Sequence, residues 1–337
     1  MTSLDAVPFS VLDLSPIGEG GTPGQALRDT RELAKAVEGL GYHRMWVAEH
    51  HNMSGIASSA PAVLLAHLAD ATSTMRLGSG GVMLPNHPPL VVAEQFGMLE
   101  AMHPGRIDLG IGRAPGTDPN TARALRRSTD PLSAEDFPQQ LGELLGFFNG
   151  SFPDDHPYRS ITAVPGRGDR PGIWLLGSSG FSAQLAGMLG LPFSFAHHFS
   201  SANTLPALEL YRNSFRPSAM LEKPHAMIAA AVIAADSDDE AQRLAMPSWL
   251  SFLKLRTGRP GPLPTPETAE AYPYTDLDRE FIRERAASAI VGSPSTVRTG
   301  IADLLERTKA DELMITTQVH DLKDRIHSYE LVAALRE

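Results

Sequence analysis

The feature that most constrains the fold of this chain is the regular alternation of short apolar segments with segments of helical periodicity. The apolar segments predict eight strands, at residues 9–14, 44–48, 76–84, 106–111, 172–176, 193–196, 226–235 and 312–316. Such alternation is typical of a parallel sheet. Eight strand–helix units in 337 residues favour a closed α/β barrel, the (β/α)8 or TIM barrel, over an open doubly wound sheet.

Two stretches interrupt this alternation and are predicted to be insertions after the fourth and seventh strands. Residues 114–136 are polar and carry Arg123, Arg126 and Arg127, whereas residues 256–278 are rich in proline, glycine and tyrosine. Long loops in a compact domain often form lids or binding loops. Because no change in composition marks a boundary, residues 1–337 are predicted to form a single domain.

Composition disfavours several classes of function. The chain has 29 Lys and Arg against 39 Asp and Glu, and the net charge of −10 disfavours binding to nucleic acid. It has no cysteine, which excludes disulfides, iron–sulfur clusters and thiol nucleophiles. No segment approaches the roughly 18 consecutive apolar residues of a membrane helix, and the first eight residues lack the basic residue of a secretory signal. We therefore expect a soluble, cytoplasmic protein.

In a parallel barrel, catalytic groups lie at the C-terminal ends of the strands. This rule selects a small set of chemically useful residues: Asp13, Ser15, Glu49, His50, His51, Gly80, Gly81, Gly112, Arg113, residues 177–180, His197, His198 and Gln318.

Glu49, His50 and His51 form the densest titratable group of that set. A histidine exchanges protons near neutral pH, and a neighbouring carboxylate can orient its ring. One alternative is that these are polar strand-end residues without a role, and another is a metal site completed by His197 and His198. Adjacent residues in a regular strand point to opposite faces, so two neighbouring histidines would not both face the barrel mouth. We therefore predict no metal.

Two glycine-containing segments suggest close approach of a ligand. Residues 177–180, Gly-Ser-Ser-Gly, follow a strand and open a helix, so backbone N–H groups and serine hydroxyls there can hold a phosphate. The alternative is an ordinary helix cap with a turn. The run at residues 78–81 places glycines inside a strand, which often marks a bulge or a bound ligand. Arg113 is suited to pair with an anion or to form a surface ion pair.

Several motifs together resemble the bacterial luciferase-like flavin monooxygenases. They are Glu-His-His after strand two, Leu-Gly-Ser-Gly-Gly-Val-Met-Leu-Pro at residues 77–85, Gly-Arg-Ile-Asp-Leu-Gly-Ile-Gly-Arg at residues 105–113, and the segments 176–184 and 195–199. The resemblance covers essentially the whole chain. It implies a (β/α)8 barrel that binds reduced FMN, supplied by a separate flavin reductase. It further implies that O2 adds to the flavin and that the resulting C4a-peroxyflavin oxygenates a small organic substrate.

The resemblance also implies roles for individual residues. His50 matches the catalytic base, and Glu49, expected beside the flavin ring, is the second catalytic residue. His51 matches a residue that supports a homodimer interface, where it would approach Glu94 of a second copy. The implied cofactor contacts are Glu49, Gly80, Gly81, Arg113, Ser178, Ser179, Gly180 and Phe181, with a cis peptide bond between Gly80 and Gly81. The substrate residues expected at the remaining strand ends are His197, His198 and Gln318.

The chain also departs from the luciferases, and alternatives to the leading interpretation stay open. Gly112 stands where luciferases have a cysteine, so bioluminescence is not expected, and the resemblance is to a single-chain branch. The alternatives are an F420-dependent oxidoreductase, a flavin-binding protein without turnover and a metal-dependent hydrolase. We expect a bulky, partly aromatic substrate of the polyketide type. The expected walls of its site are Tyr272, Tyr274, Phe281, the insertion arginines, Phe193, Phe195, His197 and His198.

Overall fold

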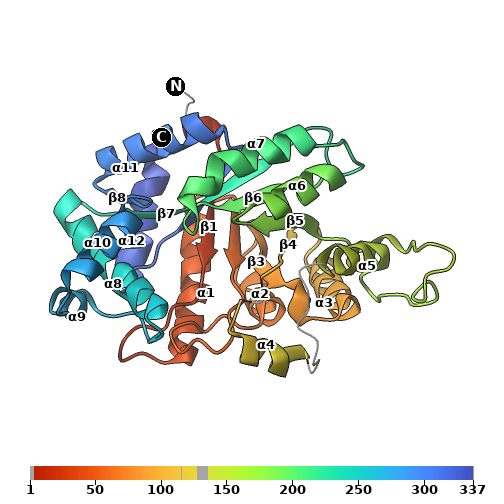
Figure 1. Cartoon of the computed structure of the whole chain (residues 1–337), viewed down its shortest axis with the longest axis horizontal. Coiled ribbons are helices and arrows are strands. Elements are labelled where there is room, and N and C mark those ends of the chain that lie inside the picture. The colour runs from red at the N-terminus through yellow and green to blue at the C-terminus, as the bar shows by residue number, and fades with distance from the viewer. Residues whose placement is uncertain (1–3, 115, 127–135, 337) are drawn as a thin grey trace.

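The computed structural model describes residues 4–114, 116–126 and 136–336 and has a closed parallel barrel at its centre (Figure 1). The barrel strands are hydrogen-bonded in the order β1-β2-β3-β4-β5-β6-β7-β9, and β9 returns to β1. They are β1 (Phe9–Asp13), β2 (Arg44–Val47), β3 (Arg76–Met83), β4 (Ile107–Gly112), β5 (Gly172–Gly177), β6 (Phe193–Ala196), β7 (Ala226–Ala234) and β9 (Glu312–Thr316). The predicted (β/α)8 barrel is therefore confirmed.

Helices cover the outside of the barrel and bury their apolar stripes against it. The helices that follow the barrel strands are α1 (Pro23–Gly39), α2 (Pro61–Ala69), α3 (Pro89–Met102), α5 (Phe137–Asn149), α6 (Gly180–Leu189), α7 (Thr204–Ser214), α8 (Asp238–Arg256) and α12 (Leu322–Ala333). Proline occupies the first turn of many of them, where its missing N–H is not needed. None of the described helices is long and apolar enough to cross a membrane.

The two insertions are more structured than the sequence predicted. The first contains α4 (Pro119–Arg126), and the second contains α9 (Pro266–Glu270) and the start of α10 (Asp276–Ala286). The strand β8 (Ile290–Gly292) and α11 (Pro294–Thr308) then lead to β9. β8 pairs only with β7 and stands outside the barrel. Thr275 and Asp278 form a capping box at the start of α10, a local signal that the sequence did carry. Arg127 lies outside the described residues.

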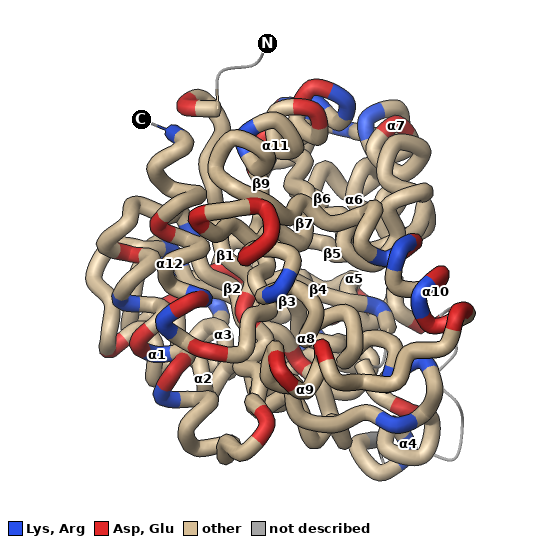
Figure 2. Tube along the Cα trace, turned by 90° about the vertical axis from the view of Figure 1, so that its left-hand side faces the viewer, with Lys and Arg blue, Asp and Glu red and all other residues tan. Residues whose placement is uncertain are grey.

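Charged residues of both signs are interspersed along the outer helices and loops, as Figure 2 shows for α1 and α10. Arg243, for example, lies on the exposed side of α8 within 4 Å of three glutamates, Glu240, Glu267 and Glu270. Such pairs keep their charges in water and contribute little to stability.

The N-terminal end of the barrel is closed by a buried charge network. The Arg44 guanidinium lies 2.5 Å from Asp108 Oδ2 and 2.7 Å from Glu312 Oε1, and the side chains of all three are at most 7% exposed. Ser10 donates to Glu312, and Arg76 pairs with the other oxygen of Asp108. Every charge in this layer therefore has an opposite partner, as burial demands.

A layer of apolar side chains lies above this network. Trp46 and Trp174 meet edge to face, with ring centroids 5.4 Å apart, and Leu12, Met227 and Met314 pack around them. Trp46 also donates its Nε1–H to Asp108, which joins the two layers. This layer forms the floor of the space above it, at the C-terminal ends of the strands.

The glycines of β3 are required by the packing of the barrel itself. A Cβ on Gly80 would lie 2.8 Å from Leu12 Cδ1, and a Cβ on Gly81 would lie 2.7 Å from the carbonyl oxygen of Gly110. The register of β3 against β4 shifts between Gly80 and Val82. The Gly80–Gly81 peptide bond is cis, as the resemblance implied.

Three loops meet at the rim of the barrel mouth and are joined by main-chain hydrogen bonds. Ile17 N–H donates to the Gly55 carbonyl at 2.9 Å, Leu263 N–H to the Ile17 carbonyl at 2.8 Å and Glu19 N–H to the Leu263 carbonyl at 2.8 Å. The loop after β1 is thereby held between the loop after β2 and the second insertion. We call the segments 15–19, 53–58 and 260–265 the rim.

Candidate functional site

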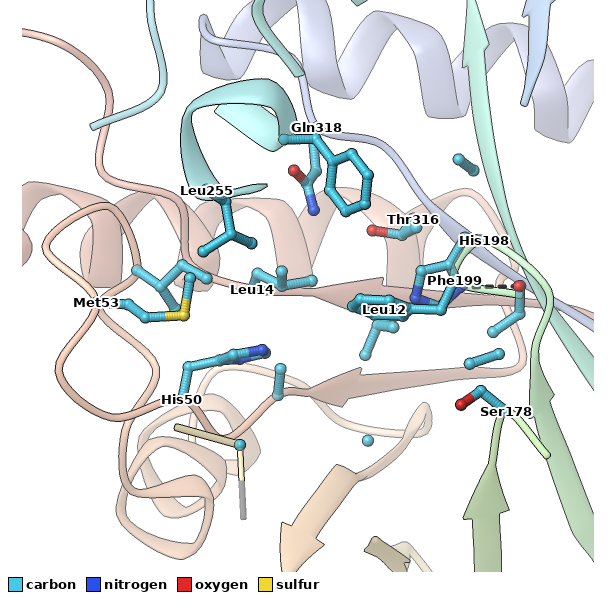
Figure 3. A pocket seen from close by; sticks show the side chains of 18 of the residues that line it. Leu12, Leu14, His50, Met53, Ser178, His198, Phe199, Leu255, Thr316 and Gln318 are labelled. Carbon is cyan, nitrogen blue, oxygen red and sulfur yellow. Dashed lines mark hydrogen bonds between the residues drawn. The ribbon is translucent and has the colours of Figure 1, made fainter. Parts of the chain in front are cut away.

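A cavity of about 850 Å³ opens at the C-terminal ends of the barrel strands. Its walls are mainly apolar and include Leu12, Leu14, Met53 and Leu255, among which His50 projects (Figure 3). This volume and this mixture of apolar walls with few polar groups are typical of small-molecule sites.

His50 is the strongest candidate base in the cavity. It lies three residues beyond the end of β2, and its backbone N–H donates to the carbonyl of Ser58, which fixes the main chain there. Its buried Nδ1 has no hydrogen-bond partner among the described residues. Burial lowers the pKa of His50, while the nearby Glu49 acts to raise it. The imidazole is therefore neutral at neutral pH and free to accept a proton.

Glu49, predicted to be catalytic and to lie beside the flavin ring, does not line the cavity. Its fully buried carboxylate accepts from His51 Nε2 at 2.8 Å, from His87 Nε2 at 2.9 Å and from the Met83 N–H at 3.1 Å. Burial acts to raise the pKa of Glu49, but these hydrogen bonds, above all that from His87, hold it below its ordinary value. Glu49 is thus an ionised anchor behind the cavity wall.

His51 and His50 both border the cavity, although alternation within a strand argued against this. The reason is that β2 ends at Val47, so the two-residue period no longer applies to these residues. The ring of His51 turns back to Glu49, and only its Nδ1 remains for any further contact.

The potential metal ligands of this region differ from those that the sequence suggested. Ligand atoms of Glu49, His51 and His87 lie within 4.8 Å of one another, whereas His197 and His198 are not part of this group. The Glu49 carboxylate already accepts hydrogen bonds from both imidazoles and from a backbone N–H. The group therefore satisfies its own charges through hydrogen bonds.

A second polar region lies where β4 and β5 end. Ser178 and Ser179 line the cavity, and Ser179 precedes α6 without capping it through its side chain. Gly180 is the first residue of α6 and is not itself in the wall. Arg113 also lines the cavity, with its guanidinium stacked over the half-exposed ring of Phe181 at 4.2 Å. An uncapped ten-residue helix with two hydroxyls and an arginine fits a phosphate group.

The two histidines after β6 lie in different environments. His198 is buried in the cavity wall, and its Nδ1 donates to the Ala229 carbonyl at 2.9 Å, so its Nε2 is left as an acceptor (Figure 3). Burial lowers the pKa of His198 to about 4. His197 does not line the cavity, because its ring bonds to Thr204 Oγ1 at 2.7 Å. The structure therefore brings His198, but not His197, to the predicted substrate site.

Of the remaining predicted residues, some line the cavity and others do not. Gln318 lines the cavity as expected. Phe193 and Phe195 are fully buried in the core instead, and Tyr272, Tyr274 and Phe281 pack in a separate cluster with Leu250 and Leu253 of α8. Asp13, another strand-end residue, is bonded to Arg325 at 3.1 Å and to Thr30 at 2.6 Å, and it joins α12 and α1 to β1. Arg123 is exposed on α4 and lies outside the wall.

Sequence reasoning missed several residues of the wall. Thr316 ends β9, and its buried hydroxyl faces the cavity with no partner in the part of the chain that the structure describes (Figure 3). The strand-end rule applies to Thr316, so this residue was within reach of the sequence. Trp249 and Phe252 of α8 and Arg285 of α10 also line the cavity. Nothing in their local sequence distinguishes them from other helical residues.

Comparisons with known proteins agree with this geometry. A family model described as luciferase-like monooxygenase matches residues 7–312. A luciferase-like monooxygenase of Escherichia coli strain K12 is 46% identical, and the match covers 98% of this chain and 97% of the relative. An N-acetyl-S-alkylcysteine monooxygenase of Bacillus subtilis is 37% identical over 97% of both chains. The crystal structure of apo-MsnO8 has a TM-score of 0.89 at 36% identity, covering 98% of both chains.

Proposed function

Because the chain belongs to the luciferase-like monooxygenase family, we propose that it uses reduced FMN and O2 to oxygenate a small organic substrate. The observation that carries this proposal is the combination of two features in one cavity. An uncapped helix end with Arg113 suits a phosphate, and His50, whose Nδ1 is without a partner among the described residues, lines the same mainly apolar cavity.

The residues present fit FMN at both ends of the molecule. The phosphate would be held by Ser178, Ser179, the N–H groups that open α6, and Arg113. The flavin ring would lie toward the wall that Gly80, Gly81 and Trp46 provide. Bound in this way, reduced FMN supplies the electrons that activate O2 for insertion into the substrate.

The chain itself contributes proton transfer and a water-poor environment. His50 presents an unprotonated nitrogen that accepts a proton at Nδ1 and returns it. Glu49 does not touch the cavity, and by bonding to His51 and His87 it joins the main chain next to His50 to the segment that follows β3. The apolar walls exclude water from the cavity, which protects the activated oxygen from side reactions with water.

We also propose that a separate flavin reductase supplies the reduced cofactor. Oxidised FMN should then bind weakly, so the purified protein should be nearly colourless. Tight yellow co-purification would contradict this part of the proposal and indicate a resident flavin.

The test of the proposed function is an oxygenation assay with isotopically labelled O2. The protein is combined with a flavin reductase, NADH and FMN, and label incorporation is followed by mass spectrometry. N-acetyl-S-alkylcysteines are the first substrates to try, because a relative acts on them, and polyketide-type phenols are the second. Turnover with reduced F420 in place of reduced FMN, without label in the product, would contradict the proposal. Binding of reduced FMN with no product from any substrate class would leave a flavin-binding protein without turnover.

Arg113→Gln is expected to weaken FMN binding by roughly tenfold while leaving riboflavin binding unchanged, since a charge-assisted contact to phosphate is lost. Fluorescence titration with the two flavins measures the difference. Arg123→Gln removes an exposed arginine outside the wall and serves as the control. Equal losses for FMN and riboflavin would place Arg113 elsewhere than at the phosphate.

We further propose a homodimer that uses α3. Val91, Met98 and Met102 on this helix are 38%, 51% and 54% exposed, and Val63 on α2 beside it is 71% exposed. Exposed apolar residues in such a group are typical of an interface. Light scattering is expected to give the mass of two chains, and Met98→Glu is expected to give that of one. A wild-type monomer at working concentration would contradict the assignment.

A further inference from the structure

Arg285, in α10, lines the cavity and has no acidic partner among the described residues. Its Nη1–H donates to the backbone carbonyl of His198, and its guanidinium lies over the ring of Phe252 at 4.5 Å. Burial lowers the pKa of Arg285, and no carboxylate of the described residues offsets this effect. An arginine with only a carbonyl and an aromatic ring as partners is unusual in a chain of net charge −10.

The other charged side chains of the described cavity wall, histidines apart, already have partners or an assigned ligand. Asp118 accepts hydrogen bonds from Asn52 and Thr121. Arg113 stacks over Phe181 beside the phosphate-binding end of α6. Arg285 is therefore the cation of this wall that remains without a counter-charge.

The two arginines enter the wall from different parts of the fold. Arg113 follows β4 and stands next to the residues that end β5, whereas Arg285 comes from the insertion after β7 and contacts the segment after β6. Next to Arg285 the wall is built by α8, which contributes Trp249 and Phe252. A ligand that reaches Arg285 is thus surrounded by apolar surface, where a charge pair is stronger than in water.

We propose that Arg285 is the anchor for an anionic group of the substrate, which makes the substrate an apolar molecule that carries a carboxylate. The proposal rests on the proposed function, because it assigns the substrate class of the same cavity. The fork of the guanidinium matches a carboxylate, and the remaining N–H groups of Arg285 are available for it. The same chemistry would also suit the phosphate of the flavin, and the experiment separates these two sources.

Binding is measured without flavin by quenching of tryptophan fluorescence, since Trp249 lines the cavity. The probes are phenylbutyrate and its neutral amide, phenylbutyramide, which differ in charge and little in shape. The variants are Arg285→Gln, Arg285→Lys and, as a matched control, Arg283→Gln, which changes an exposed arginine of the same helix. Circular dichroism verifies that each variant is folded, and titrations with FMN and riboflavin are run in parallel.

The wild type and the Arg283→Gln variant are expected to bind the carboxylate about tenfold or more tightly than the amide. Arg285→Gln should abolish this preference with little change for the amide, and Arg285→Lys should retain part of it. The proposal is overturned if the wild type shows no preference, or if Arg285→Gln weakens both probes equally. It is also overturned if that variant weakens FMN but not riboflavin, which would assign Arg285 to the phosphate. A retained carboxylate preference without any oxygenation would count against the proposed function and leave the anchor in place.

Discussion

His50→Ala is expected to lower product formation by about 10²-fold or more while the affinity for reduced FMN stays nearly unchanged. The physical reason is that Nδ1 of His50 is buried without a hydrogen-bond partner among the described residues and that the imidazole is neutral at neutral pH. Its removal takes away the proton acceptor and leaves the phosphate-binding residues untouched. Single-turnover kinetics with reduced FMN separate the chemical step from binding.

The control for this experiment is His67→Ala, which removes an exposed histidine of α2 that lies outside the cavity wall. This variant should form product at the wild-type rate. If His50→Ala turned over at the wild-type rate, His50 would have no part in proton transfer.

The pH dependence of the wild type follows from the same residue. The pKa of His50 lies below its ordinary value of 6.5 because burial disfavours the imidazolium. The base form therefore persists at and above pH 6.5, and kcat/KM should fall only as the pH drops below that value. A rate that rises on acidification would mean that the protonated imidazole is the active form.

Arg44→Met is expected to destabilise the protein by about 3–5 kcal/mol, because it leaves two buried carboxylates without their shared cation. Asp108 and Glu312 are both about 1% exposed and lie 2.5 and 2.7 Å from the guanidinium. Urea unfolding followed by far-ultraviolet circular dichroism measures the loss. Arg243→Met, on the exposed surface of α8, is the matched control and should shift the midpoint far less.

The loss of stability in the Arg44→Met variant should depend on pH. Burial acts to raise the pKa of Glu312, but the nearby imidazole of His225 and the charge of Arg44 hold it below 4.5. A carboxylate with a lowered folded pKa contributes stability above its unfolded pKa, and that contribution disappears as the pH falls through the folded value. The difference between wild type and Arg44→Met should thus be largest above pH 4.5 and shrink in more acidic buffer. A difference that is constant across that range would indicate lost packing alone.

The barrel was predictable because each of its strands is an apolar run bounded by loop residues and followed by a helical period. The strand-end rule also selected residues that do line the cavity: His50, Gly80, Gly81, Arg113, Ser178, Ser179, His198 and Gln318. These positions are fixed by the topology, since parallel strands bring their C-terminal ends to one face.

The rest of the site could not be predicted, because the periodicity of strands and helices does not specify the directions of side chains in the loops. Glu49 and His197 follow their strands by one or two residues, where the chain has already left the pleat, and both turn away from the cavity. Arg285 reaches the wall only because the second insertion folds back over the barrel mouth. The tyrosines of that insertion instead pack with Leu250 and Leu253 of α8 in a separate apolar cluster.

The rim has a consequence for how relatives of this protein diverge. Its joints are hydrogen bonds between main-chain groups at Ile17, Gly55 and Leu263. Glycine is required at position 55, because a Cβ there would lie 2.2 Å from the carbonyl oxygen of Gly261. Met53, Ile56 and Leu263 point into the cavity from this frame and can be exchanged one at a time while the mouth stays assembled. Single substitutions of these side chains can therefore change which small molecule the cavity accepts while the fold is kept.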